Sequence, residues 1–154
     1  MKTPDELRTL IGQPPFVTDW IMIDQTRINQ FADCTDDHQF VHVDPERAQH
    51  TVFRGTVAHG FLTLSLLASM MYQSPFTNTG TGRTGVNYGL NRVRFLSPVH
   101  AGKRVRGHLA LSELEDKGHG RVQLLLACSV EVEGQDKPAM IADWIIQFID
   151  GDEG

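Results

Sequence analysis

The sequence predicts an α+β fold in which a curved antiparallel sheet wraps around one long buried helix. Residues 57–72 are the most hydrophobic stretch, with apolar side chains on nearly all sides, as is typical of a buried helix. Segments after residue 91 alternate polar and apolar side chains, a period of two that indicates strands. Short glycine-containing turns separate these segments, so we expect neighbouring strands to be antiparallel.

The first part of the chain predicts short elements. Thr3 and Glu6 form a capping box at the start of a helix, which Gly12 ends. Residues 16–23 favour one short strand. Asp24 can then cap a second helix.

Two further segments precede and follow the hydrophobic stretch. Residues 34–44 are predicted to form a polar loop, and Asp44 followed by Pro45 starts a short helix through Ala48. Residues 74–85 are rich in glycine and threonine, which indicates another loop.

The remainder of the chain predicts strands. Apolar side chains fall on one face of each segment, and turns are expected at residues 117–120 and 133–136. The expected strands lie around residues 92–95, 104–111, 122–132 and 140–148.

Length and composition indicate one domain over residues 1–154, with a helical arm at 1–15 and an acidic tail at 150–154. A net charge of −5 argues against nucleic acid as a partner. No apolar run reaches the ~18 residues that a membrane span needs, so no membrane partner is expected. Two cysteines, Cys34 and Cys128, argue against a disulfide framework and predict a reducing compartment, which we take to be the cytoplasm.

The loop at residues 36–44 concentrates three aspartates and two histidines. A histidine beside a carboxylate can perform acid/base chemistry near neutral pH, although a solvated polar loop would look the same. His38 and His42 are four residues apart, a spacing that also occurs in zinc sites. Because Pro45 follows closely and no cysteine cluster accompanies them, we predict no metal.

A second candidate lies at the start of the hydrophobic helix, where His59 precedes Gly60. The first turn of a helix offers free N–H groups and the positive end of the helix dipole. Glycine there lets a substrate approach the backbone closely, as an oxyanion hole requires. Gly60 could instead serve only to let the helix approach the sheet.

Together these residues resemble the hydratase motif of MaoC-like dehydratases, which include (R)-specific enoyl-CoA hydratases and a branch like nodulation protein N. The motif has an aspartate, a polar amide two residues on, a histidine five residues on, and a later His-Gly pair. Here these positions hold Asp37, Gln39, His42 and His59–Gly60. Residues 88–95, followed by Pro98 and Val99, also resemble the family, and the likeness covers about residues 16–148.

The resemblance implies the hot-dog fold, a homodimer, and a role in fatty acid metabolism. It implies reversible hydration of a trans-2-enoyl thioester to an (R)-3-hydroxyacyl thioester, with coenzyme A or a carrier's pantetheine as part of the substrate and no other cofactor. Asp37 and His42 would be catalytic, and Gly60 would hold the thioester oxygen. Gln39 and His59 would help to position the substrate, although many members carry asparagine where this chain has Gln39.

Two alternative functions and one further expectation remain. A hot-dog thioesterase would need a carboxylate on the buried helix, and residues 61–72 contain none. A non-catalytic acyl-thioester-binding protein could dispense with the Asp/His pair, which this chain keeps. Arg83, Arg92 and Arg94 are expected to contact substrate phosphates.

Overall fold

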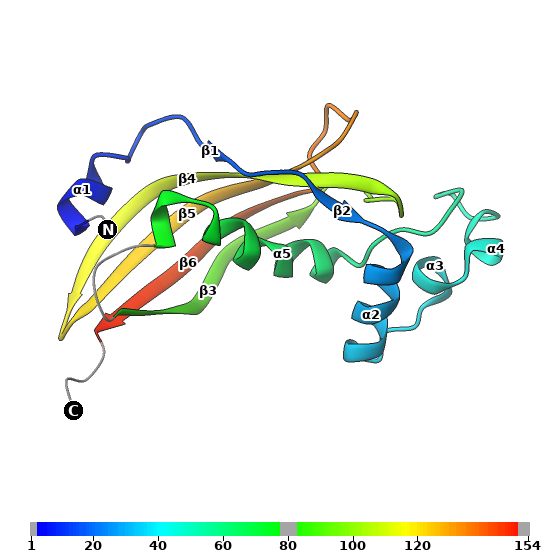
Figure 1. Ribbon diagram of the computed structural model, residues 1–154, viewed down its shortest axis with the longest axis horizontal. Coiled ribbons are helices and arrows are strands. Elements are labelled where there is room, and N and C mark those ends of the chain that lie inside the picture. Colours follow the sequence, from blue (N-terminus) through cyan, green and yellow to red (C-terminus); the bar gives the residue numbers. More distant parts are fainter. Residues whose placement is uncertain (1–2, 78–82, 151–154) are drawn as a thin grey trace.

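The computed structural model describes residues 3–77 and 83–150. Part of the loop expected at residues 74–85 and most of the acidic tail expected at 150–154 lie outside the described residues. The described chain forms one curved antiparallel sheet that wraps around a central helix (Figure 1). This arrangement confirms the predicted fold class.

The sheet has six strands in the order β1-β4-β5-β6-β3, with β2 also paired to β4. The pairs β4–β5 and β5–β6 are consecutive and antiparallel, as the alternating pattern predicts. The strands are β1 (Phe16–Val17), β2 (Ile21–Ile23), β3 (Arg83–Phe95), β4 (Lys103–Gly118), β5 (Arg121–Val132) and β6 (Met140–Asp150).

Strand β3 departs from the predicted order of neighbours. It begins at Arg83, well before the expected start at residue 92, and it pairs with β6 instead of with β4, the next strand along the chain. Pairing with β6 places β3 at one edge of the sheet, so one side of this strand has no partner among the described residues.

Helix α5 (Gly60–Tyr72) crosses the concave face of the sheet. It begins at Gly60, directly after His59, as predicted, and the first residues of the hydrophobic run lie before it, where Val57 forms a β-bridge with His100. It is also not buried all round: Phe61 is 68% exposed and Tyr72 is 81% exposed. The opposite side of the helix enters the core between the helix and the sheet.

The N-terminal elements lie along the outer strand β4. Helix α1 (Pro4–Arg8) has the predicted capping box at Thr3. The single strand expected at residues 16–23 is divided into β1 and β2, because the Gly107 N–H donates to the Thr18 hydroxyl at 2.8 Å and not to a backbone carbonyl. The side-chain acceptor interrupts the ladder of backbone hydrogen bonds.

Three helices gather beyond one end of the sheet: α2 (Gln25–Thr35), α3 (Phe40–Val43) and α4 (Pro45–Ala48) (Figure 1). Asp24 caps α2 by accepting from the Arg27 N–H at 2.8 Å, as predicted. The loop expected at residues 34–44 contains the turn of helix α3, which the sequence pattern did not indicate. Among residues 3–77 and 83–150, no helix has the length and apolar character needed to cross a membrane.

Candidate active site

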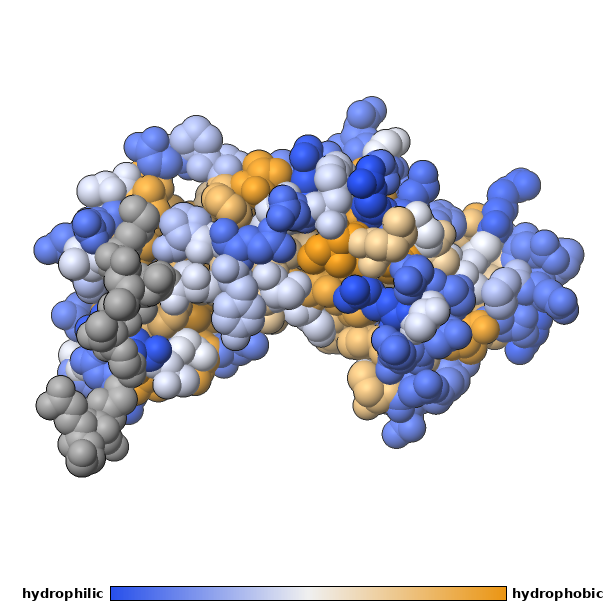
Figure 2. Space-filling view, viewed as in Figure 1, coloured by the Kyte–Doolittle hydropathy of each residue, from blue (hydrophilic) through white to orange (hydrophobic). Residues whose placement is uncertain are grey.

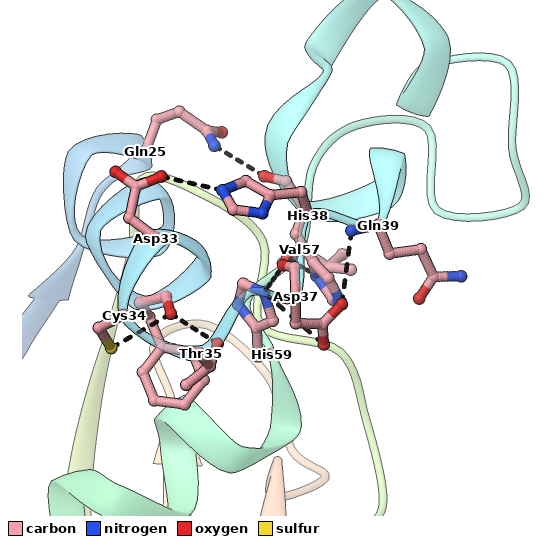
Figure 3. A network of polar contacts seen from close by, with 11 residues as sticks. Gln25, Asp33, Cys34, Thr35, Asp37, His38, Gln39, Val57 and His59 are labelled. Carbon is pink, nitrogen blue, oxygen red and sulfur yellow. Dashed lines mark hydrogen bonds and ion pairs between the residues drawn. The ribbon is translucent and has the colours of Figure 1, made fainter.

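The Asp/His loop and the start of α5 meet at the end of the sheet where α2, α3 and α4 lie. Asp36 ends α2 in the left-handed conformation, with φ of 57°. That turn reverses the chain and brings Asp37 over the first residues of α5, next to His59 (Figure 3). Residues 22 positions apart in sequence are thereby joined: the His59 Nε2 lies 2.9 Å from the Asp37 carbonyl oxygen.

His42 is held in one tautomer by the backbone. Its Nδ1 lies 2.7 Å from the Val57 carbonyl oxygen. Because a carbonyl can only accept, Nδ1 carries the hydrogen and Nε2 is left with a free lone pair. The main chain of His42 is held as well, since the Gln25 amide donates to its carbonyl at 2.7 Å. His42 therefore presents a proton-accepting nitrogen from a fixed ring.

The surroundings of His42 favour its neutral form. Partial burial lowers the pKa of His42 below its ordinary value of 6.5, and the nearby His59 lowers it further. The hydrogen bond to Val57 and the charge of Asp37 act in the opposite direction on this pKa but do not outweigh the loss of solvation. At neutral pH the ring is therefore available as a base.

His59 is the buried member of the cluster, with only 3% of its surface exposed. Its ring stacks on the His42 ring, with centroids 3.8 Å apart and an interplanar angle of 26°. Its Nε2 donates to the Asp37 carbonyl and lies 4.0 Å from Asp37 Oδ2. His59 thus contacts both members of the predicted catalytic pair.

The carboxylate of Asp37 stays half exposed. Its Oδ1 accepts weakly from the Gln39 N–H at 3.4 Å, and 53% of its side chain is accessible. Potential ligand atoms of Asp37, His42 and His59 all lie within 4.8 Å of one another. A water molecule between Asp37 and His42 could therefore meet a carboxylate and an imidazole together.

The same three side chains suit proton transfer better than metal binding. A bound ion must lie close to the plane of each imidazole that ligates it, since nitrogen lone pairs lie in the ring plane. The rings of His42 and His59 are stacked and nearly parallel, so their lone pairs do not converge on one point. Each ring has in addition one nitrogen bonded to a backbone carbonyl.

Gly60 begins α5 beside this cluster. No hydrogen bond among the described residues uses its N–H, as expected for the first turn of a helix. A cavity of about 460 Å³ adjoins it and is also lined by His42, Phe95 and the buried Thr63. A methyl group on Gly60 would lie 3.1 Å from the Phe95 ring, so glycine keeps this part of the cavity open.

Gln39 also lines the cavity. Its side chain points away from the Asp37 carboxylate (Figure 3). Within the described part of the chain, its amide group forms no hydrogen bond that would commit it to a structural role. Gln39 can therefore contact a substrate but does not orient Asp37 through its side chain.

The three arginines that were expected to contact substrate phosphates do not meet at this site. Arg92 is paired across the sheet with Asp143, and their side chains form an ion pair of 3.3 Å on the face away from α5. Arg94 is two residues along the same strand and shares that face. Arg83 lines a different cavity, of about 260 Å³, beside the C-terminal half of α5. Contact of these arginines with a substrate remains a prediction.

Some supporting groups were not expected from the sequence. The Val57 carbonyl sets the His42 tautomer, and Gln25 holds the His42 main chain. A backbone acceptor leaves no signature in a sequence, and a glutamine at a helix start is common. Thr63, three residues after Gly60, could have been found from helical spacing, which places it on the same face.

Most of the chain is similar to proteins of known family. Residues 6–131 match the model of the MaoC like domain. The chain is 50% identical over 141 residues to nodulation protein N of Rhizobium leguminosarum bv. viciae, covering 90% of this chain and 87% of that protein. It is 45% identical over 144 residues to 3-hydroxyacyl-thioester dehydratase Z of Mycobacterium tuberculosis, covering 94% of each.

Solved structures confirm the hot-dog architecture. A monoamine oxidase regulatory protein from Archaeoglobus superposes with a TM-score of 0.77 at 24% identity, over 92% of this chain and 91% of that one. An (R)-hydratase from A. caviae involved in PHA biosynthesis has a TM-score of 0.69 at 19% identity, over 87% and 95% of the two chains. At such identities the likeness concerns the fold.

Proposed function

The chain belongs to the MaoC-like domain family, and from that membership we propose that it is an enoyl-thioester hydratase, an enzyme of the hydro-lyase class. The substrate is a trans-2-enoyl thioester of coenzyme A, and the product is the (R)-3-hydroxyacyl thioester. One observation carries the proposal: His42, which has a free lone pair, and Gly60, which has an unused N–H, line one cavity, and an oxygen of the Asp37 carboxylate lies within 4.8 Å of a ring nitrogen of His42. The (R) configuration follows from the resemblance alone.

In the hydration step, Asp37 and His42 hold one water molecule. Its oxygen bonds to C3 of the enoyl chain while the pair takes one of its protons. Electrons of the double bond move toward the thioester oxygen, and the proton is then returned to C2, so that one water is added in total. Because the two groups act on the same water, their apparent pKa values belong to the pair.

Gly60 stabilises the charge that develops during this step. A conjugated thioester becomes an enolate-like anion as water attacks, and an oriented N–H at its oxygen lowers the barrier. The N–H of Gly60 is unused and stands at the positive end of the 13-residue helix α5. The adjoining cavity, with Phe53 and Phe95 in its wall, can hold the first part of an acyl chain.

The proposed activity is tested by following the absorbance of a crotonyl-CoA solution after enzyme is added. Hydration removes the conjugated absorbance without releasing thiol. Release of thiol would identify a thioesterase, and an unchanged spectrum with saturable binding would identify a binding protein. Either result would overturn the proposal.

The role of the pair is tested with Asp37→Asn, His42→Ala and the double variant. Each single change should lower kcat by ~10² or more, the scale for a positioned acid or base. The double variant should lose much less than the product of the two effects, since both groups act on one water. Fully multiplicative losses in folded variants would show that the groups act independently.

We also propose that the enzyme is a homodimer. Strand β3 is 13 residues long and, within residues 3–77 and 83–150, pairs on only one side. Such an edge can pair with a strand of another chain. The space-filling view shows apolar surface along the middle of one face (Figure 2). Large apolar side chains are exposed on β3 and on the neighbouring side of α5: Phe61, Tyr72, Tyr88 and Leu90.

The assembly is measured by sedimentation at micromolar protein concentration. A dimer is expected for the wild type, and a charge at an exposed apolar position, as in Tyr88→Glu, should shift it toward monomer. A stable and active monomer would contradict the proposal, whatever the result of the hydration assay.

A further inference from the structure

We propose that His59 is a positioning residue that joins Asp37 and His42 into one rigid unit, with its Nε2–H fixing the Asp37 main chain and its ring face fixing the His42 ring. This inference deepens the proposed hydration and depends on it for its kinetic consequence. The geometry on which it is built does not depend on the substrate.

The first contact of His59 is with the backbone of Asp37. The His59 Nε2 lies 2.9 Å from the Asp37 carbonyl oxygen, so Nε2 must carry the hydrogen. Asp37 follows the left-handed residue Asp36 and belongs to no helix or strand. The only other hydrogen bond within the described residues that involves Asp37 is the weak 3.4 Å contact with Gln39. The hydrogen bond from His59 is therefore the main interaction that holds the Asp37 backbone in place.

The second contact is with the ring of His42. The two rings are stacked with centroids 3.8 Å apart. Phe31 of α2 packs against the His59 ring as well, with centroids 5.0 Å apart at an angle of 51°. Since His59 is anchored at the start of α5 and is buried, its ring is a fixed surface that limits how far the His42 ring can rotate about its side-chain bonds.

The remaining nitrogen of His59 argues against a purely structural role. Its Nδ1 is buried and has no hydrogen-bond partner among the described residues. Buried polar atoms without partners are rare because leaving one unpaired is costly, and packing alone would be served by an apolar ring. A histidine at this position is explained if the hydrogen bond from its Nε2 to the Asp37 carbonyl is needed to hold Asp37 in place.

The groups that face His42 are Asp37, the His59 ring and the Val57 carbonyl.

Two variants separate the two contacts. His59→Phe keeps an aromatic ring under His42 and removes the donor to Asp37. His59→Gln keeps an amide donor and removes the ring. We expect each to lower kcat by about 10- to 100-fold, as when groups that orient a reacting side chain are removed. KM should change by less than about 3-fold, because His59 is buried and, in contrast to the substrate contact expected from the sequence, does not line the cavity. His108→Gln is the matched control, since His108 bonds Glu131 at 2.7 Å, outside the cluster.

The pH profile provides a readout that simple loss of packing would not move. The proximity of His59 contributes to lowering the His42 pKa. In His59→Phe that contribution is lost, so the rising limb of kcat/KM against pH should move to higher pH. A profile that falls in height but keeps its wild-type shape would overturn the proposed coupling between the rings.

Nitrogen NMR of the histidine rings tests the geometry without any turnover. In the wild type we expect Nε2 of His59 and Nδ1 of His42 to carry hydrogen, because each faces a backbone carbonyl. A His59 ring without hydrogen on Nε2 would overturn the inference even in an active enzyme. If the wild type does not hydrate crotonyl-CoA but shows these tautomers, the proposed function fails and the geometric part of the inference stands.

Discussion

Replacement of Gly60 by alanine tests the oxyanion site most directly. The added methyl carbon would lie 3.1 Å from three atoms of the Phe95 ring, where ordinary contact begins at 3.4 Å. The ring or the helix start must therefore shift by a few tenths of an ångström. Phe95 is 48% exposed and can move, and alanine favours a helix over glycine by about 1 kcal/mol. We expect little change in the free energy of unfolding.

The effect on activity should be much larger. Both the new methyl group and the displaced Phe95 ring project into the cavity beside the Gly60 N–H. A thioester oxygen pushed away from that N–H loses the contact, and removal of one oxyanion donor costs ~10²–10³ in rate. We expect kcat/KM for crotonyl-CoA to fall by about that factor, with the thermal unfolding temperature almost unchanged.

A second variant shows which group causes the obstruction. Phe95→Leu in the Gly60→Ala background frees the crowded side of the methyl group. Partial recovery of kcat/KM would show that the displaced ring blocks the substrate, and no recovery would show that the methyl group itself does. The oxyanion assignment would be refuted if Gly60→Ala kept wild-type kcat/KM, or if activity fell only in proportion to unfolding.

Three further results are expected. The pKa of His42 lies below 6.5, so the ring stays neutral as the pH falls toward that value. The rising limb of kcat/KM against pH should therefore have its midpoint below pH 6.5, and His42→Ala should abolish this limb. Burial raises the pKa of Cys128 to about 12, so a thiol reagent should label the exposed Cys34 alone in the native protein and both thiols after denaturation; rapid native labelling of two thiols would contradict this burial. Gly107→Val should lower the free energy of unfolding by about 1–3 kcal/mol by overpacking, since even a methyl group there would lie 2.8 Å from the Met70 sulfur; urea unfolding with an unchanged midpoint would contradict the close packing.

Local chemistry in the sequence determined much of the fold. The capping box at Thr3, the Asp24 cap and the alternating pattern of β4, β5 and β6 are all present in the structure. These features depend on residues within a few positions of one another, so their energetics are visible in sequence. The apolar run likewise identified the central helix, although only the structure showed its exposed side at Phe61 and Tyr72.

Contacts between distant residues could be decided only by the tertiary structure. The sequence indicated Asp37, His42 and Gly60 as reacting groups, but not that β3 pairs with β6, which turns Arg92 and Arg94 away from the cavity. It gave no sign of the Val57 carbonyl at His42 or of the stacked ring of His59. Hydrogen bonds to backbone carbonyls and the stacking of rings cannot be predicted from residue types, because they depend on how the chain turns at Asp36 and where α5 begins. Residue types therefore determined which groups can react, and the packing of α2 and α3 against the start of α5 determined how those groups face one another.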